Sequence, residues 1–108
     1  MAIETGKRPA VTDNTAFRIR DLDGAVAHVK QAPTPGHARA RKHRVYKIGV
    51  ELKQQSDRIV SSLERGEAWL AQNEGHAKYR EREDQWMQWL VDYEAIEDAL
   101  ERAKEVDR

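Results

Sequence analysis

Apolar residues recur at helical spacing along the last two thirds of the chain. From about Ala38 they lie three, four or seven positions apart, which places them on one stripe of an α-helix. The members of this first stripe are Val45, Ile48, Leu52, Ile59, Leu63, Trp69 and Leu70. The pattern predicts a long helix over about residues 38–73.

A second apolar stripe follows the turn-forming residues Asn73-Glu74-Gly75. Its members are Tyr79, Trp86, Trp89, Leu90, Tyr93, Ile96, Leu100 and Ala103. Four of them, from Tyr79 to Leu100, lie seven residues apart, the repeat that keeps one seam facing a partner helix. We therefore expect a turn at 73–76 and a helix over about 77–106. So short a connection favours antiparallel neighbours, which predicts a long, coiled-coil-like two-helix hairpin.

Residues 1–36 follow a different pattern. Phe17-Arg18-Ile19-Arg20 alternates apolar and basic residues, which is typical of a short strand or an extended docking segment. Asp21 is suited to cap a short helix that would contain Leu22, Val26 and Val29. Pro33 and Pro35 would stop any helix, because proline lacks the amide donor and disfavours helical geometry in the preceding residue. The segment is predicted to be a largely extended N-terminal arm with room for one short helix.

Composition agrees with an all-α chain of this kind. The 108 residues fit a single globular unit, divided here into the arm and Pro/Gly linker (1–36) and the helical hairpin (37–108). Apolar residues make up 39% and charged residues 35%, against about 45–50% and 25% in ordinary domains. These figures favour a small core with long solvated helical faces.

Several function classes find no support in the sequence. The absence of cysteine excludes disulfides, thiol nucleophiles and Cys-rich zinc sites. None of the four histidines lies three residues after a Glu, as the metal sites of helical bundles require. Phosphate-binding glycine loops and nucleophile elbows are also missing. We expect a non-enzymatic protein without cofactor, metal or small-molecule substrate.

The distribution of apolar residues also predicts where in the cell the protein is located. No apolar run approaches the roughly 20 residues of a membrane span, and the N-terminal residues have no apolar stretch that could form the middle of a signal peptide. We therefore expect a cytoplasmic or intravirion protein that does not enter a membrane.

Basic residues are concentrated where the first long helix is predicted to begin. Residues 37–47 contain five cations and no acid, and the cations are Arg39, Arg41, Lys42, Arg44 and Lys47. Such a segment can bind nucleic acid through the phosphate backbone without reading its sequence. Alternatively, it pairs with acidic groups of the second helix or with an acidic partner protein. Both interpretations remain open at this point.

The second predicted helix is acidic over most of its length. Between Arg82 and Arg102 it has no Lys or Arg and seven carboxylates, namely Glu83, Asp84, Asp92, Glu94, Glu97, Asp98 and Glu101. A solvated outer face explains this pattern most simply. The other interpretations are a surface that docks a basic partner and a negative rod that imitates a nucleic-acid backbone.

The aromatic residues suggest the leading functional hypothesis. Exposed Trp and Tyr often anchor protein interfaces, so Trp86, Trp89 and Tyr93 are expected to bind a protein partner or a second copy. The apolar residues of the arm, including Phe17 and Ile19, are too few for a separate core and should dock on a larger body. The sequence thus favours an assembly or accessory protein, of phage type or a subunit of a larger complex. The alternatives are a nucleic-acid-associated regulator that uses 39–47 and an acidic-helix inhibitor of a DNA-binding protein.

Overall fold

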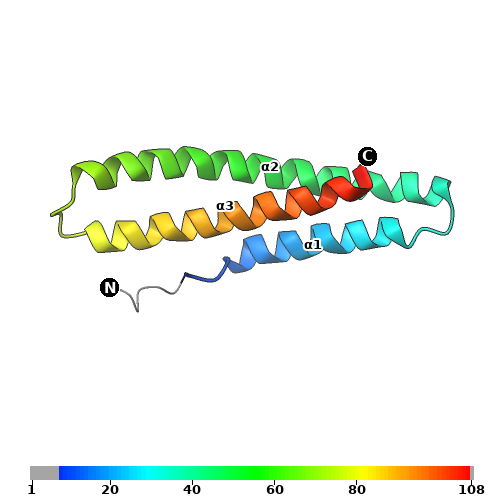
Figure 1. Cartoon of the computed structure of the whole chain (residues 1–108), viewed down its shortest axis with the longest axis horizontal. Helices are drawn as coiled ribbons and strands as arrows, with labels where there is room; N and C mark the ends of the chain where they lie inside the picture. Colours follow the sequence, from blue (N-terminus) through cyan, green and yellow to red (C-terminus); the bar gives the residue numbers. More distant parts are fainter. Residues whose placement is uncertain (1–7, 108) are drawn as a thin grey trace.

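In the part of the chain that the structure describes, three α-helices form an elongated bundle of 60 × 26 × 19 Å (Figure 1). The structure, a computed structural model, describes residues 8–107. The helices are α1 (Asp13–Lys30), α2 (Pro35–Gln72) and α3 (Tyr79–Asp107). No strand occurs within 8–107, so the predicted all-α fold class is confirmed. The two-helix hairpin is corrected to a three-helix bundle, in which α2 runs antiparallel to both α1 and α3.

The prediction of a largely extended arm is wrong for residues 13–30. This segment is an 18-residue helix, and the Phe17–Arg20 stretch lies in it rather than in a strand. Its buried residues, Thr15, Leu22, Ala25, Val26 and Val29, form one face that packs against α2 and α3. Burial of this face stabilises a helix that its local sequence specifies only weakly, because most helical stability in proteins comes from tertiary packing.

All three helices lie side by side only in the middle of the molecule. The buried residues of α2 fall between Val45 and Ser56, and those of α3 fall between Val91 and Val106. Figure 1 shows that α2 and α3 continue without α1 toward the turn at 73–78. At the opposite end, α1 and α2 continue beyond the C-terminus of α3. The bundle is therefore staggered, with a two-helix segment at each end.

Asp92 of α3 caps α1 from a neighbouring helix. Its carboxylate accepts hydrogen bonds from the backbone N–H of Thr12 at 3.0 Å and from the hydroxyl of Thr12 at 2.7 Å. The hydroxyl of Thr15 lies 3.3 Å from the same carboxylate and accepts from the amide of Gln55 on α2 at 2.8 Å. The first N–H groups of a helix need acceptors from outside it, and Asp92 supplies one. This network joins all three helices.

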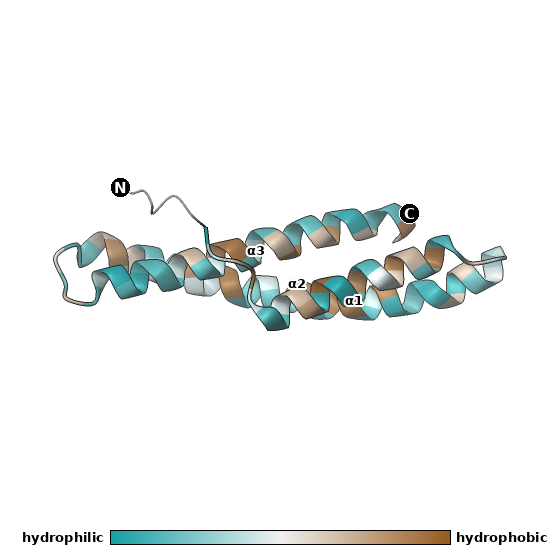
Figure 2. Cartoon of the chain, turned by 90° about the horizontal axis from the view of Figure 1, so that it is seen from below, coloured by the Kyte–Doolittle hydropathy of each residue, from teal (hydrophilic) through white to brown (hydrophobic). Residues whose placement is uncertain are grey.

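Residues 8–12 cross α3 before α1 begins, as Figure 2 shows. The amide of Gln88 donates to the carbonyl oxygen of Ala10 at 2.8 Å, and Arg8 forms an ion pair with Glu94. Val91 lies between these two contacts along α3 and is buried. The described part of the predicted arm therefore packs on its own chain.

The face that α3 buries differs from the predicted seam. Tyr79, Trp86, Tyr93 and Leu100 are half-buried, whereas the buried residues of α3 are Val91, Asp92, Ile96, Ala99, Ala103 and Val106. The predicted seam assumed one partner helix. Because α3 packs against α1 as well as α2, the centre of its buried face is rotated from the seam toward α1. No helix within 8–107 has the length and apolar character needed to cross a membrane.

Candidate functional site

The end of the α2/α3 hairpin that α1 does not cover carries most of the aromatic side chains. We call residues 57–72 and 79–90 the aromatic end. It contains all three tryptophans, Trp69, Trp86 and Trp89, and each of them is half-buried. Among the described residues of the aromatic end, none is fully buried, in contrast to 45–56 and 91–106. Two helices alone do not enclose side chains of this size.

Close approach of α2 and α3 at the aromatic end depends on Gly66. A Cβ atom at this position would lie 2.9 Å from Cδ1 of Trp86 and 3.4 Å from Cζ3 of Trp89. The indole N–H of Trp86 donates to the carbonyl oxygen of Leu63 at 3.0 Å. Trp86 therefore lies against the backbone of α2 and holds the two helices together, which gives this predicted interface residue a structural role.

One face of the aromatic end forms a groove of about 910 Å³, which we call the arm-side groove. Pro9 from the crossing segment contributes to its apolar part, together with Leu70, Trp86 and Met87. Charged residues of both signs line the remainder, including Arg80 and Glu83. The groove is within the size range of small-molecule sites, but its lining is also that of a protein interface.

A second groove of about 260 Å³ contains Trp69, Gly66 and Trp89, and we call it the α1-side groove. Its charged residues are Arg65 from α2 and Arg82 from α3. The guanidinium carbon of Arg82 lies 5.1 Å from the ring centroid of Trp69, a cation–π arrangement. His76 of the turn meets the same indole edge-on, with ring centroids 5.2 Å apart. These contacts fix the orientation of Trp69 at one end of the groove.

The structure distributes the predicted partner-binding residues over different parts of the bundle. Trp86 and Trp89 belong to the aromatic end, and Tyr93 is half-buried just beyond it on α3. Phe17 is 66% exposed on α1, while Ile19 packs against the hydrophobic core. The five residues are therefore not parts of one surface, and Ile19 supports the fold.

The predicted basic segment, residues 39–47, lies in the first turns of α2 at the end opposite the tryptophans. Arg44 forms an ion pair with Asp21 of α1 at 2.7 Å, and Arg41 donates to the carbonyl oxygen of His28 at 2.8 Å. Lys42 is half-buried, and Arg39 and Lys47 are exposed. Two of the five cations thus stabilise the packing of α1 on α2. An ion pair between this segment and the acidic residues of α3 is not found within 8–107.

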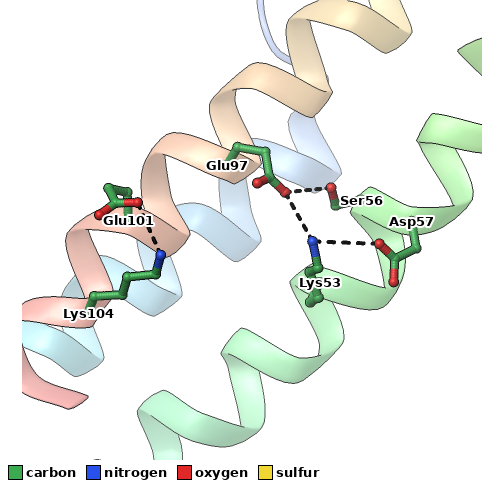
Figure 3. Close-up of polar contacts among 6 residues, drawn as sticks. All are labelled: Lys53, Ser56, Asp57, Glu97, Glu101 and Lys104. Atoms are coloured by element: carbon green, nitrogen blue, oxygen red, sulfur yellow. Dashed lines mark hydrogen bonds and ion pairs between the residues drawn. The ribbon is translucent and has the colours of Figure 1, made fainter. Parts of the chain in front are cut away.

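The acidic residues of α3 do not form one continuous solvated face. Asp92 is buried in the cap of α1, and Glu94 pairs with Arg8. Figure 3 shows that Glu97 accepts a hydrogen bond from the hydroxyl of Ser56 at 2.7 Å and lies 3.8 Å from the ammonium of Lys53. In the same view Glu101 pairs with Lys104 of its own helix at 3.2 Å. Four of the seven carboxylates therefore have partners within the chain.

Three residues that shape the aromatic end were not predicted from the sequence to be part of a functional site: Arg65, Gly66 and Arg82. A glycine on the apolar stripe of one helix, with tryptophans on the facing helix, was the available signal for close packing. The arginines resembled ordinary surface charges in the sequence. Groups of three His, Asp or Glu residues able to hold a metal are not present in the described part of the chain.

Comparisons of the chain with protein-family models, with curated proteins and with solved structures found no match.

Proposed function

We propose that this chain is a non-enzymatic interaction protein that assembles with a partner protein through its aromatic end. The observation that carries the proposal is the stagger of the bundle, because α1 begins beyond the tryptophans and runs away from them, which leaves the aromatic end uncovered. A buried Trp covers about 150–250 Å², so completing the burial of half-buried indoles contributes substantially to association. Apolar patches left open on a folded protein often mark interaction sites.

The composition of the aromatic end supports the same proposal. Trp, Met and Arg are enriched in the cores of protein interfaces, and Trp and Arg dominate their energetic hot spots. The α1-side groove of the aromatic end contains Trp69, Trp89 and Arg82, and Met87 lies in the arm-side groove. Its outer parts are charged, as the rim of an interface usually is.

The remainder of the bundle provides a rigid base for this surface. In the middle of the molecule the helices are joined by the core and by the network around Asp92. The aromatic end projects from this base as a two-helix rod (Figure 1). A preorganised surface loses less conformational entropy on binding than a flexible one.

Site-specific photo-crosslinking in the cell of origin tests the proposal. A photoreactive amino acid replaces Gln85, which lines the α1-side groove, and in a control protein it replaces the exposed Asp98 of α3. We expect a covalent adduct of defined mass from position 85 and none from position 98. The adduct should disappear when Ser62→Glu introduces a charge into the groove. Adducts from position 98 alone, or from neither position, would overturn the proposal.

A nucleic-acid-associated regulator is the second candidate function. The observation that favours it is that Arg39, His43 and Lys47 are exposed in the first turns of α2, at the end of the bundle opposite the tryptophans. The acidic-helix decoy has less support, because Asp92 is buried and Glu97 is bound to Ser56. A phosphate-binding function predicts an affinity for duplex DNA that falls steeply with salt, whereas the leading proposal predicts no tight complex with DNA.

A further inference from the structure

The α1-side groove continues the track along which α1 packs on the hairpin. Gln55 of α2 bonds to α1 and is followed at seven-residue intervals by Ser62 and Trp69, which both line the groove. On α3, the groove residue Gln85 lies seven positions before Asp92, the residue that caps α1. Residues seven apart lie on the same face of a packed helix. The groove is therefore the uncovered continuation of the site that α1 occupies.

The contacts of α1 show which chemistry this track accepts. Leu22 is completely buried between the two other helices. The residues before and after it are aspartates, and their carboxylates contact the two helices that form the walls of the track, one on α2 and the other on α3. Asp21 pairs with Arg44 of α2 at 2.7 Å. Asp23 accepts from Arg102 of α3 at 3.0 and 3.2 Å. An acidic–aliphatic–acidic sequence on a helix is thus recognised by one arginine on each wall.

The uncovered part of the track also has one arginine on each wall. Arg65 lies on the same stripe of α2 as Arg44, three seven-residue repeats further along, and Arg82 projects from α3 over Trp69. Acidic residues are not among those that line this groove in the described part of the chain. The floor, formed by Gly66 and the indoles, is apolar. Positive walls beside an apolar floor complement a helix with carboxylates beside an aliphatic stripe.

A second copy of the chain fits this groove poorly. A two-fold symmetric contact in which the grooves of two copies face each other would place Arg65 and Arg82 of one copy against the same residues of the other. Like charges at close range oppose association. The charge of the groove therefore favours a different protein as the occupant.

We propose that the α1-side groove binds an amphipathic helix of a partner protein in which Asp or Glu residues flank an aliphatic stripe. The bound helix would follow the track of α1 and extend the three-helix bundle over the aromatic end. This inference rests on the proposed function, because it specifies the partner chemistry for one face of that end.

A synthetic helical peptide is the probe for this inference. It has roughly 20 residues, since isolated helices shorter than about 12–15 residues are marginal in water. Aliphatic residues follow a heptad pattern, Asp and Glu flank them, and aromatic residues are left out. In the control peptide, Asn and Gln replace every acid. All three tryptophans of the chain lie at the aromatic end, so intrinsic fluorescence of the full chain reports binding there directly.

We expect the acidic peptide to change the tryptophan fluorescence saturably, with affinity that falls as salt is added. Replacing both wall arginines, Arg65→Gln with Arg82→Gln, should weaken binding by about five- to tenfold, the sum of two exposed ion pairs. The matched control is Arg80→Gln, because Arg80 lines the arm-side groove and should not affect binding. Circular dichroism establishes that each variant keeps its helical content.

The outcomes separate this inference from the proposed function. Equal affinity of the acidic and neutral peptides, with no effect of the arginine substitutions, overturns the acidic-helix inference and leaves an apolar interface in place. Failure of both peptides to bind also overturns it, and the crosslinking at position 85 then decides the proposed function independently. A binding loss with Arg80→Gln that matches the double variant would place the peptide in the other groove and overturn the inference.

Discussion

The carboxylate of Asp92 accepts a hydrogen bond from the backbone N–H of Thr12, 3.0 Å away, and so caps a helix to which it does not belong. Thr12 precedes α1, but its own side chain does not cap that helix. Asp92 is only 6% exposed and is surrounded by donors from α1, from the preceding residues and from Gln88. The pair therefore fixes where α1 begins relative to α3, and with it how much of the hairpin α1 leaves uncovered.

Removing this cap should destabilise the whole bundle. Asp92→Ala is expected to lower the free energy of unfolding by about 1–3 kcal/mol, because it removes the acceptor of the part-buried Thr12 N–H and hydroxyl and of the buried Thr15 hydroxyl. Urea unfolding followed by circular dichroism measures the change. The control Asp98→Ala removes an exposed carboxylate from the same helix and should change stability by less than about 0.5 kcal/mol. Equal losses in the two variants would argue against the capping role.

Long helices were predictable because their apolar residues repeat over many turns. Of the helix at 13–30, the sequence indicated only a short piece containing Leu22, Val26 and Val29, since its apolar face is small and its stability depends on helices that lie far away in the sequence. Asp92 illustrates the same limit at the level of one side chain. In the sequence it is one of seven acids on an acidic helix, and only the position of α1 makes it a buried acceptor. The partial burial of the tryptophans likewise results from the stagger of the helices, which no local sequence pattern specifies.

Glycine-to-alanine substitutions should have different effects at two helical positions. A Cβ atom added at Gly24 of α1 would meet nothing within 4 Å, so Gly24→Ala should gain about 1 kcal/mol from helix propensity. At Gly66 the added methyl group would collide with Trp86. Overpacking of this kind costs about 1–3 kcal/mol, which offsets or exceeds the same gain. In urea unfolding, we expect the Gly66→Ala variant to be about 2 kcal/mol less stable than the Gly24→Ala variant. Equal stabilities of the two variants would show that the Trp86 ring moves away from the added methyl group at no cost.

Two apolar residues of α1 should differ sharply in their contribution to stability. Leu22 is completely buried, and Leu22→Ala should cost about 2–5 kcal/mol through lost burial and the cavity left behind. Phe17 is 66% exposed, so Phe17→Ser should change the free energy of unfolding by less than about 0.5 kcal/mol. Thermal or urea unfolding of both variants measures this contrast. A large loss for Phe17→Ser would mean that this ring is covered in solution, for example by a second copy.

Hydrogen exchange should divide the hairpin into a protected and a less protected part. Amides that open only with the core should lie at 45–56 and 91–106, where the three helices enclose buried residues. The aromatic end has no fully buried residue among those described, so its backbone should exchange faster in the free chain. Mass spectrometry of peptic fragments resolves these segments. Binding of the acidic peptide should slow exchange at the aromatic end, and protection there that already equals the core in the free chain would contradict the two-helix description.

The basic segment provides a test that separates the two candidate functions. If the chain is an interaction protein, duplex DNA at about 50 mM salt should form at most a weak complex, because Arg41 and Arg44 are engaged with α1. Fluorescence anisotropy of labelled duplex measures the affinity, and Arg39→Ala with Lys47→Ala should leave partner crosslinking at position 85 intact. A tight complex that weakens by orders of magnitude at about 200 mM salt, and that the same two substitutions abolish, would favour the nucleic-acid function instead. Changes at the aromatic end, at the opposite end of α2, should then have no effect on DNA binding.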